Sequence, residues 1–396
     1  MDDNSSNAAA IVLIGGGFAG LTTALALSRS KYRSPIILIE PRHRFVFLPL
    51  LYELLSGELQ AWEVAPFYKD LLANKGIVWI QDYARNIDID KKVVITGAGQ
   101  LISYSDLVLG TGSKPNTYGI KGVLNNTLRF NEFEDVQILK ELILKLNNLN
   151  NQKKSLVIVG AGASGVELAC KVADLVKENV QIHLVDSGER VLANGKSFNQ
   201  EQVEKALNKK SIQLHLQSNV LEIDSENVFI SSIGEEPNDV ITLKHDGVIW
   251  NAGVKPFIPF EGFNDSSKDG RVLVDSYLKV LDMNDIFAAG DIAFDGNTLS
   301  KGTAQVAIQQ GEFLADGFMA SVKRKTHKPF EFIDRGEMLS LGIGEATITG
   351  LGITLAGPRA FQLRRMIYLS KMPSLSLGMR SASSWFLGNI KHNWLT

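Results

Sequence analysis

Two stretches of the chain, residues 9–40 and 156–186, share one order of apolar and polar positions. Each begins with a run of aliphatic residues, passes through a glycine-rich turn into a segment of helical periodicity, and ends in a second aliphatic run closed by an acidic residue. A short aliphatic run before a turn predicts a buried strand, and the whole order predicts a βαβ unit. The repetition predicts an α/β chain with two Rossmann-like dinucleotide-binding domains.

In the first stretch, Gly15, Gly17 and Gly20 stand at the GxGxxG spacing directly after the aliphatic strand. The first glycine permits the tight turn, the second lets a pyrophosphate approach the backbone, and the third lets the helix pack on the strand. The helix N-terminus presents unpaired N–H groups to the phosphates. Glu40 closes the second strand, where its carboxylate can accept hydrogen bonds from ribose hydroxyls. We predict a dinucleotide site here, which includes Phe18 and Ala19 at the helix start.

In the second stretch, Gly160, Gly162 and Gly165 repeat the glycine spacing, and Asp186 closes the second strand. An aspartate at this position would bind a ribose diol and repel a 2′-phosphate, which favours NADH over NADPH. Arg190 lies close enough in sequence to compensate for a phosphate, so both nucleotides stay open.

Glu167 follows these glycines inside the second predicted helix. We expect its carboxylate to face the cofactor and to orient the nicotinamide. A solvent-exposed helical carboxylate without a role is the alternative.

Length, net charge and cysteine content limit the classes of function and of redox chemistry that the chain can have. A chain of 396 residues with a net charge of −2 is long enough for two or three domains and lacks the basic bias of a general nucleic-acid binder. The single cysteine, Cys170, excludes an internal disulfide, a CxxC pair and a thiolate metal cluster. We predict no metal site, so any redox chemistry must come from a bound cofactor. The polar N-terminus does not resemble a signal peptide, and no apolar run long enough for a spanning helix is present.

A third element, residues 280–291, is a turn followed by an apolar strand that ends in Gly290 and Asp291. Together with the strands that lead to Gly110 and Gly253, it resembles the two-dinucleotide-binding-domain flavoproteins over nearly the whole chain. The resemblance implies FAD on the first unit, NAD(P)H on the second, and Asp291 on the FAD ribitol. Residues 110–112 read Gly-Thr-Gly where that family usually has Ala-Thr-Gly.

Residues 301–311 contain Gln305 and Gln309 four positions apart, on one face of a predicted helix. The segment resembles the AQxAxQ pattern of type II NAD(P)H:quinone oxidoreductases. That likeness implies that both glutamines line a quinone pocket beside the flavin. The alternative is a helix of small residues that only packs on FAD.

Residues 42–66, 336–342 and 365–369 resemble the cyanobacterial and plastid branch of the type II enzymes. That branch includes the demethylnaphthoquinone reductase of phylloquinone biosynthesis, and it can use NADPH. The likeness implies a membrane quinone as acceptor, either demethylnaphthoquinone or plastoquinone.

From these motifs we assign the ranges as follows. We expect residues 1–118 and 255–335 to form the FAD-binding domain, 119–153 a linker helix, 154–254 the NAD(P)H-binding domain, and 336–396 a quinone- and membrane-contact region.

The tail beyond Glu345 carries only basic charges, among them Arg364 and Arg365. On a helical wheel its last residues place one apolar stripe opposite cations and predict contact with an anionic membrane surface. The stripe consists of Met379, Phe386, Leu387, Ile390 and Trp394. We expect a peripheral enzyme on the cytoplasmic or stromal face, with the thylakoid as one candidate membrane. Packing on the protein's own core or in a homodimer is the alternative.

Other functions for the same nucleotide sites stay open. One is a soluble FAD-dependent reductase of a small electron-carrier protein, which the basic tail would dock. Another is a redox sensor without enzymatic turnover.

Overall fold

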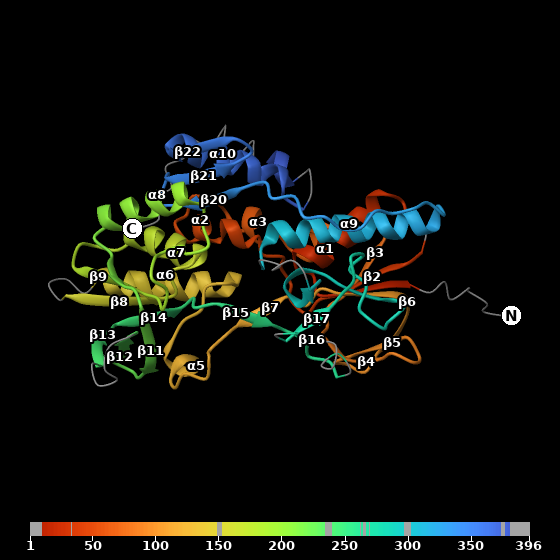
Figure 1. Cartoon of the computed structure of the whole chain (residues 1–396), viewed down its shortest axis with the longest axis horizontal. Helices are drawn as coiled ribbons and strands as arrows, with labels where there is room; N and C mark the ends of the chain where they lie inside the picture. Colours follow the sequence, from red (N-terminus) through yellow and green to blue (C-terminus); the bar gives the residue numbers. More distant parts are fainter. Residues whose placement is uncertain are drawn as a thin grey trace. The chain divides into compact units, whose positions relative to one another are not determined.

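The computed structural model describes residues 10–32, 34–148, 153–233, 240–261, 263, 267–268, 270–296, 302–373 and 377–380 (Figure 1). By its internal contacts the chain forms two compact units. The first unit comprises Met1–Phe45, Pro66–Lys114 and Val254–Ile333. The second unit comprises Val46–Ala65, Pro115–Gly253 and Asp334–Thr396. The chain therefore crosses between the units several times, and we describe each unit by itself.

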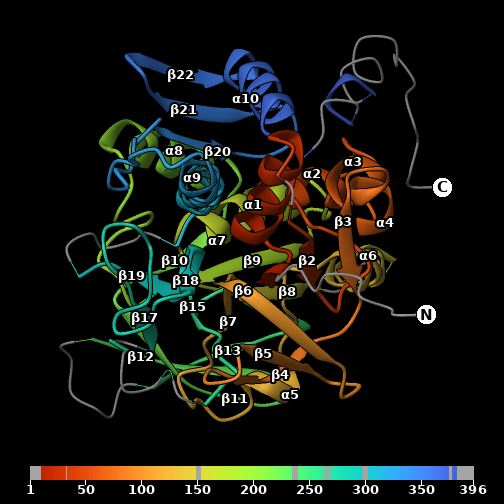
Figure 2. The same cartoon turned by 90° about the vertical axis from the view of Figure 1, so that its right-hand side faces the viewer.

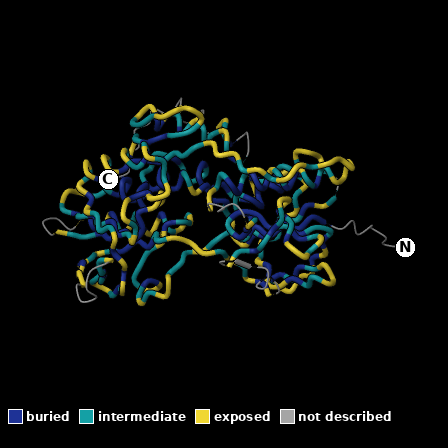
Figure 3. The backbone as a smooth tube through the Cα atoms, viewed as in Figure 1, coloured by how far each residue is buried: buried dark blue, intermediate teal, exposed yellow. Residues whose placement is uncertain are grey.

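The first unit is built on a sheet in which β1 lies between β2 and β6 and pairs with both in parallel. All five residues of β1 are buried, as expected for a central strand that is covered on both faces. Figure 3 shows the buried backbone inside the units and most of the exposed backbone along their surface. β3 and β18 continue the parallel part, and β5 and β4 add an antiparallel edge. The strands are β1 (Ala10–Ile14), β2 (Ile36–Ile39), β3 (Ile77–Ile80), β4 (Ala84–Asp88), β5 (Val93–Thr96), β6 (Leu101–Leu109) and β18 (Ile286–Ala288).

Two helices of the first unit, α1 (Phe18–Arg29) and α9 (Ala304–Val322), pack against each other. Small residues permit this approach: the Thr23 hydroxyl donates to the carbonyl of Gly311 at 3.2 Å. The first unit also contains α4 (Tyr68–Leu72), β16 (Ser267–Lys268), β17 (Arg271–Leu273), η2 (Gly290–Ile292) and β19 (Ala293–Phe294). Two short strands pair with each other where the chain passes from one unit to the other, β7 (Ser113–Pro115) and β15 (Val254–Pro256).

The second unit repeats the architecture with a parallel four-stranded sheet in the order β10-β9-β8-β14. An antiparallel meander packs on this sheet, and the core between them includes Val157, Val185 and Ile230. The strands of the sheet are β8 (Lys154–Val159), β9 (Val180–Val185), β10 (Gln213–His215) and β14 (Gly247–Trp250), and those of the meander are β11 (Ser218–Ile223), β12 (Asn227–Ser232) and β13 (Val240–Lys244). The helices are α5 (Val123–Asn126), α6 (Phe133–Asn148), α7 (Ala163–Ala173) and α8 (Ser197–Lys209).

The C-terminal module, residues 337–370, also belongs to the second unit. It is an antiparallel sheet of β20 (Glu337–Ser340), β21 (Ala346–Gly350) and β22 (Ile353–Gly357), covered by α10 (Pro358–Ser370). Figure 2 shows β21, β22 and α10 lying together, with a small core that includes Ile348 and Phe361. The same unit includes the segment with η1 (Leu48–Leu50), α2 (Leu51–Leu55) and α3 (Ala61–Val64).

The predicted fold class is confirmed, because both βαβ units are present with a glycine turn between strand and helix. The division by contacts follows other boundaries than the predicted ranges, since residues 46–65 join the second unit. The assignment of a nucleotide to each range stays a prediction. Among the described residues, no helix is long and apolar enough to cross a membrane.

Candidate functional site

The first glycine turn is closed by backbone at Gly15 and Gly20 and leaves space for a ligand at Gly17. Gly15 has a φ of +98°, and a Cβ there would lie 2.3 Å from the carbonyl oxygen of Gly110. A Cβ on Gly20 would lie 2.0 Å from the carbonyl oxygen of Gly15. At Gly17, the N-cap of α1, a Cβ would meet none of the described atoms within 4 Å. The turn is therefore closed on the protein side and open at the helix N-terminus, as a pyrophosphate site requires.

Glu40 is tied to this turn. Its Oε2 accepts a hydrogen bond from the backbone N–H of Gly16 at 2.7 Å, and its Oε1 accepts from the guanidinium Nε of Arg42 at 2.8 Å. Burial acts to raise the pKa of Glu40, but the hydrogen bond and charge of Arg42 outweigh it and lower the pKa. The Tyr68 hydroxyl donates to the carbonyl of Gly16 at 2.7 Å. The carboxylate of Glu40 is thus held in its ionised form between the glycine turn and Arg42.

Sequence reasoning missed Arg42 and Tyr68. Arg42 had a local signal, because a basic residue two positions after the strand-ending acid can fold back on it. Tyr68 had none, because only the fold brings it to the turn.

The Gly-Asp motif lies in the same unit. The N–H of Gly290, which has a φ of +75°, donates to the side-chain oxygen of Gln310 at 2.6 Å. Asp291 accepts a hydrogen bond from the hydroxyl of Ser113 at 2.5 Å. A Cβ on Gly290 would be 3.6 Å from the Cβ of Ala19 at the start of α1. The structure therefore brings Gly290 and Asp291 to the turn formed by Gly15–Gly20, together with Gln310, which sequence reasoning missed.

The two glutamines of α9 are in different situations. Gln309 is buried, and its amide both donates to the carbonyl of Ile333 at 2.9 Å and accepts from the N–H of Ile333 at 3.0 Å. Gln305 is half-buried in the first turn of the helix. The amide of Gln309 thus holds Ile333, the last residue of the first unit. The quinone role of Gln305 and Gln309 stays a prediction.

Phe18 and Phe45 pack edge to face, with ring centroids 5.3 Å apart. Both belong to the first unit, so this contact braces the start of α1.

The second glycine turn has the same pattern of close backbone contacts as the first. Gly160 has a φ of +107°, and a Cβ there would lie 2.4 Å from the carbonyl oxygen of Asn251. A Cβ on Gly165 would lie 1.7 Å from the carbonyl oxygen of Gly160, whereas one on Gly162 would meet none of the described atoms within 4 Å. Asp186 accepts a hydrogen bond from the N–H of Ala161 at 2.5 Å. This turn too is open only at its helix N-terminus.

The surroundings of Asp186 differ from those of Glu40. Its other oxygen accepts from the backbone N–H of Gly188 at 2.6 Å, and Arg190 is exposed. Gly253, with a φ of +98°, lies in the same unit beside the Tyr118 hydroxyl, which would be 2.9 Å from a Cβ at that position.

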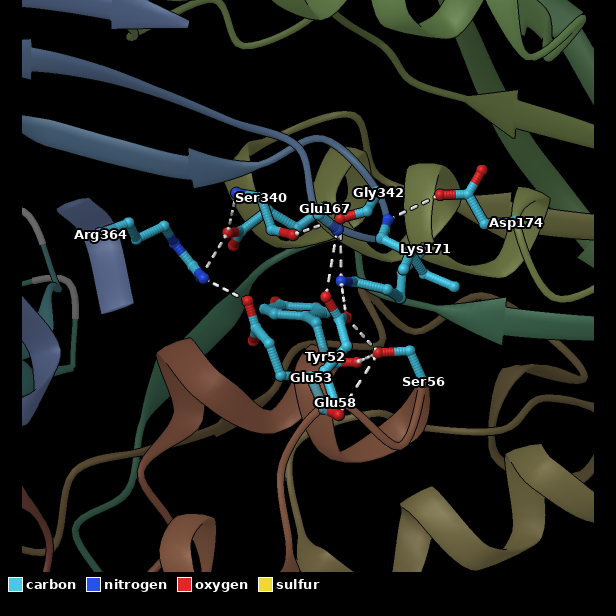
Figure 4. A network of polar contacts seen from close by, with 12 residues as sticks. Tyr52, Glu53, Ser56, Glu58, Glu167, Lys171, Asp174, Ser340, Gly342 and Arg364 are labelled. Atoms are coloured by element: carbon cyan, nitrogen blue, oxygen red, sulfur yellow. Dashed lines mark hydrogen bonds and ion pairs between the residues drawn. The ribbon is translucent and has the colours of Figure 1, made fainter. Parts of the chain in front are cut away.

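Glu167 lies at the centre of a buried polar network of the second unit (Figure 4). Its Oε1 accepts from the N–H of Ser340 at 2.7 Å and from the guanidinium of Arg364 at 3.2 Å. Arg364 is also paired with Glu53 and donates to the carbonyl of Pro49 at 2.6 Å. Burial raises the pKa of Glu167 to about 7, although the charge of Arg364 acts to lower it. The alternative of a solvent-exposed carboxylate without partners is therefore wrong.

Arg364 corrects a second expectation. The sequence places it among the cations of a basic tail, but its side chain is fully buried and ion-paired. Part of the positive charge of the C-terminal module is thus neutralised inside the unit by Glu53 and Glu167. Both carboxylates lie far from Arg364 in the sequence.

The network continues one turn along α7. Lys171 is fully buried, pairs with Glu58 at 2.5 Å and donates to the carbonyl of Gly342 at 2.9 Å. Asp174 accepts from the N–H of Ile343 at 2.7 Å. Two side chains of α7 and the side chain of its C-cap residue, Asp174, thus bind the end of β20 and the turn that follows it.

Cys170, also on α7, is buried, and burial raises the pKa of its thiol to about 12. A thiol in this state packs as a small apolar group. Of the predicted membrane stripe, Met379 is exposed, whereas Phe386, Leu387, Ile390 and Trp394 lie outside the described residues.

Comparison with known proteins identifies the class. Residues 9–311 match the family described as pyridine nucleotide-disulphide oxidoreductase. The chain is 33% identical to the demethylphylloquinone reductase of Synechocystis sp., over 95% of each chain. It is 30% identical to an alternative NAD(P)H-ubiquinone oxidoreductase, chloroplastic/mitochondrial, of Arabidopsis thaliana, over 95% of this chain and 80% of that protein. Its fold matches that of NDH2 from Plasmodium falciparum solved with NADH, with a TM-score of 0.85, 18% identity and coverage of 98% and 99%.

The chain belongs to the pyridine nucleotide-disulphide oxidoreductase family, within its type II NAD(P)H:quinone oxidoreductase branch. It is accordingly an FAD-dependent enzyme that oxidises NAD(P)H and reduces a quinone.

Proposed function

We propose that this enzyme reduces demethylnaphthoquinone, the quinone precursor of phylloquinone, with plastoquinone as a second candidate acceptor. The observation that supports this choice is the 33% identity to a demethylphylloquinone reductase over 95% of both chains. A likeness that extends over 95% of both chains is not confined to the nucleotide-binding turns.

In this proposal FAD binds to the first unit. Bound FAD would supply the two-electron chemistry: acceptance of a hydride from NAD(P)H and reduction of a quinone to a quinol. The open N-cap at Gly17 fits its pyrophosphate, Glu40 its adenosine ribose, and Asp291 its ribitol. Gly15 and Gly20 let strand, turn and helix close on one another beneath it, because a Cβ at either position would meet a backbone carbonyl oxygen.

NAD(P)H binds to the second unit in the same manner. The open N-cap at Gly162 fits its pyrophosphate, and Asp186 would accept hydrogen bonds from its ribose. Because both carboxylate oxygens already accept backbone N–H groups, Asp186 is held in the position that a ribose diol would meet. This favours NADH, whereas the exposed Arg190 would allow NADPH.

The remaining roles follow from the two glutamines and Glu167. Glu167 would orient the nicotinamide ring. Gln305 would meet the quinone carbonyl directly, whereas Gln309, whose amide is paired with Ile333, would hold the pocket wall in place.

The quinone is dissolved in lipid, so we propose that the enzyme lies on a membrane surface and reaches it with the C-terminal region. Exposed apolar side chains of the C-terminal module support this, namely Leu351, Ile353 and Met366. The face would be cytoplasmic or stromal, with the thylakoid as the candidate membrane, and a homodimer would present two such regions side by side.

The test is stopped-flow absorbance of the bound flavin. NADH or NADPH is mixed with the enzyme first, and a demethylnaphthoquinone or plastoquinone analogue second. We expect rapid bleaching by at least one nucleotide and faster reoxidation by the naphthoquinone. Rapid bleaching with slow reoxidation by both quinones would contradict the proposed acceptor and leave the nucleotide sites intact.

Membrane contact is tested separately by flotation with anionic and with neutral vesicles. We expect binding to the anionic vesicles, weakened by salt. Equal recovery with and without vesicles would contradict a membrane role.

A further inference from the structure

The buried network of the second unit contains more carboxylates than cations at its centre. Arg364 is paired with Glu53 and hydrogen-bonded to Glu167, and all three side chains are buried. The other buried cation, Lys171, is matched by Glu58. If every group were ionised, the two carboxylates in contact with Arg364 would share its single positive charge. Lys171 acts on Glu167 and Arg365 on Glu53 by charge, but each also interacts with Glu58, so the centre of the cluster would keep an excess of negative charge away from water.

Such a charge is costly in a buried site, so the cluster can lower its free energy by holding a proton. Burial raises the pKa of Glu167 to about 7, and the charge of Glu53 acts in the same direction. The charges of Arg364 and Lys171 act to lower it. The proton is therefore bound and released near neutral pH on Glu167.

Three further titratable groups near Glu167 are neutral at this pH. Tyr52 on α2 and Tyr368 on α10 face the same cluster, and burial raises the pKa of both phenols, that of Tyr368 to about 12. On α7 itself, Cys170 stays protonated. At the C-cap of α7, Asp174 is paired with Lys210, so that its charge is compensated. Glu53, Arg364 and Lys171 are thus the charged groups that act on Glu167, and Lys171 has its own carboxylate partner in Glu58.

The geometry of Arg364 is suited to holding Glu167 in one orientation. The guanidinium lies 4.9 Å from the ring centre of Tyr368, donates to the carbonyl of Pro49, and binds Glu53 with its other nitrogen. The N–H of Ser340 fixes the same Glu167 oxygen from the C-terminal module. Within the described residues, Oε2 of Glu53 and Nε of Arg364 are buried without a hydrogen-bond partner. If Glu53 lost its charge, Arg364 and Glu167 would remain as a balanced pair, so the cluster tolerates the loss of this carboxylate.

We propose that Arg364 and Glu53 are positioning residues for Glu167: the guanidinium fixes its carboxylate against Ser340, and the sharing of that guanidinium with Glu53 keeps one exchangeable proton on the pair. This rests on the proposed place of Glu167 beside the nicotinamide. The cluster would then set the pH range in which NAD(P)H reduces the flavin. Glu53 and Arg364 act through Glu167 and need not touch a substrate.

The test is an infrared titration of the oxidised holoenzyme. The carbonyl stretch of a protonated buried carboxyl group is followed with pH, and its assignment is checked by its loss in Glu167→Gln. In the wild type we expect a midpoint near pH 7. In Glu53→Gln we expect the midpoint to fall by about one pH unit, a tenfold loss of proton affinity, because a neighbouring negative charge is gone.

Two further variants complete the design. Arg364→Lys keeps the charge but lacks the planar fork that reaches both carboxylates, so its midpoint should move up. It also keeps the test decisive if Glu53→Gln does not fold. Asp174→Asn, on the same helix but paired with Lys210, is the matched control and should leave the midpoint unchanged. A midpoint that Glu53→Gln and Arg364→Lys leave in place, or move in the same direction, would overturn the proposal.

The pH dependence of flavin reduction separates this inference from the proposed function. If the infrared midpoint and the kinetic midpoint shift together, both stand. If the infrared midpoint shifts and the kinetic profile does not, the cluster controls the proton of Glu167, and the proposed place of Glu167 beside the nicotinamide is wrong.

Discussion

The two βαβ units have nearly the same glycine turn, but the helix that follows the turn packs against its neighbours through different kinds of side chain. In the first unit, α1 packs on α9 through small residues, and a Cβ on Gly311 would lie 2.6 Å from the carbonyl oxygen of Ala19. In the second unit, α7 meets the C-terminal module through charged side chains, with Glu167 hydrogen-bonded to Ser340. Counted from the first glycine of each turn, Glu167 stands where α1 has Thr22.

This difference suits two kinds of ligand. A close contact of small residues has one arrangement, which would suit the resident FAD of the proposed assignment. A buried ionic contact can change its protonation with the state of the site, which suits a nucleotide that enters and leaves in every cycle. The same local motif therefore acquires a different property from the element that covers it.

The largest expected contrast concerns the two arginines bound to carboxylates. Arg364→Met would leave Glu53 and Glu167 buried without a cation and should lower the free energy of unfolding by about 3–5 kcal/mol. Arg42→Met removes a pair whose arginine is 44% exposed and whose carboxylate is buried but keeps the N–H groups of Gly16 and of residue 42, so its loss should be smaller, about 1–2 kcal/mol. Unfolding by guanidinium chloride measures both. Equal losses would show that the two units do not differ in this respect.

The pH dependence of stability gives the next contrast. Because the folded protein raises the pKa of Glu167 from 4.5 to about 7, its proton binds more tightly in the folded state. The resulting stability is fully present below pH 4.5 and is lost as the pH rises through 7, an amount on the order of 3 kcal/mol. Glu167→Gln should remove this part of the pH dependence in a series of thermal unfolding curves. Parallel curves for variant and wild type would contradict it.

A smaller effect is expected at the second residue of each turn. Gly16→Ala would place a Cβ 2.6 Å from the Tyr68 hydroxyl and should cost about 1–3 kcal/mol and weaken flavin retention. The second unit already has Ala161 at this position, and Ala161→Gly should cost less than about 1 kcal/mol. Flavin content after dialysis is the measurement, and Tyr68→Phe in the Gly16→Ala background should restore part of it. Full retention of flavin by Gly16→Ala would contradict the crowding.

Both nucleotide turns could be predicted from the sequence because their geometry is local. Gly20 and Gly165 are needed by backbone within their own βαβ unit, since a Cβ at either position would meet the carbonyl oxygen of Gly15 or Gly160, and the glycine spacing reports this directly. The burial of Arg364 could not be predicted, because its partners Glu53 and Glu167 are 311 and 197 residues away. A cation in a basic tail reads as solvent-exposed until the fold supplies its carboxylates. Likewise, the pairing of Gln309 with the backbone of Ile333 has no signal in the helix that carries it.

The most direct test of the account compares Gly17→Ala with Gly162→Ala. A Cβ at either position meets none of the described atoms within 4 Å, so each change should leave the protein's own packing intact and obstruct only a bound pyrophosphate. Flavin content and the rate of flavin reduction are measured on both purified variants. We expect Gly17→Ala to lose flavin, and Gly162→Ala to keep it, to be reduced normally by dithionite, and to be reduced at least about tenfold more slowly by NADH and NADPH. Loss of flavin from Gly162→Ala, with full flavin and slow reduction in Gly17→Ala, would show that the two nucleotides occupy the opposite units.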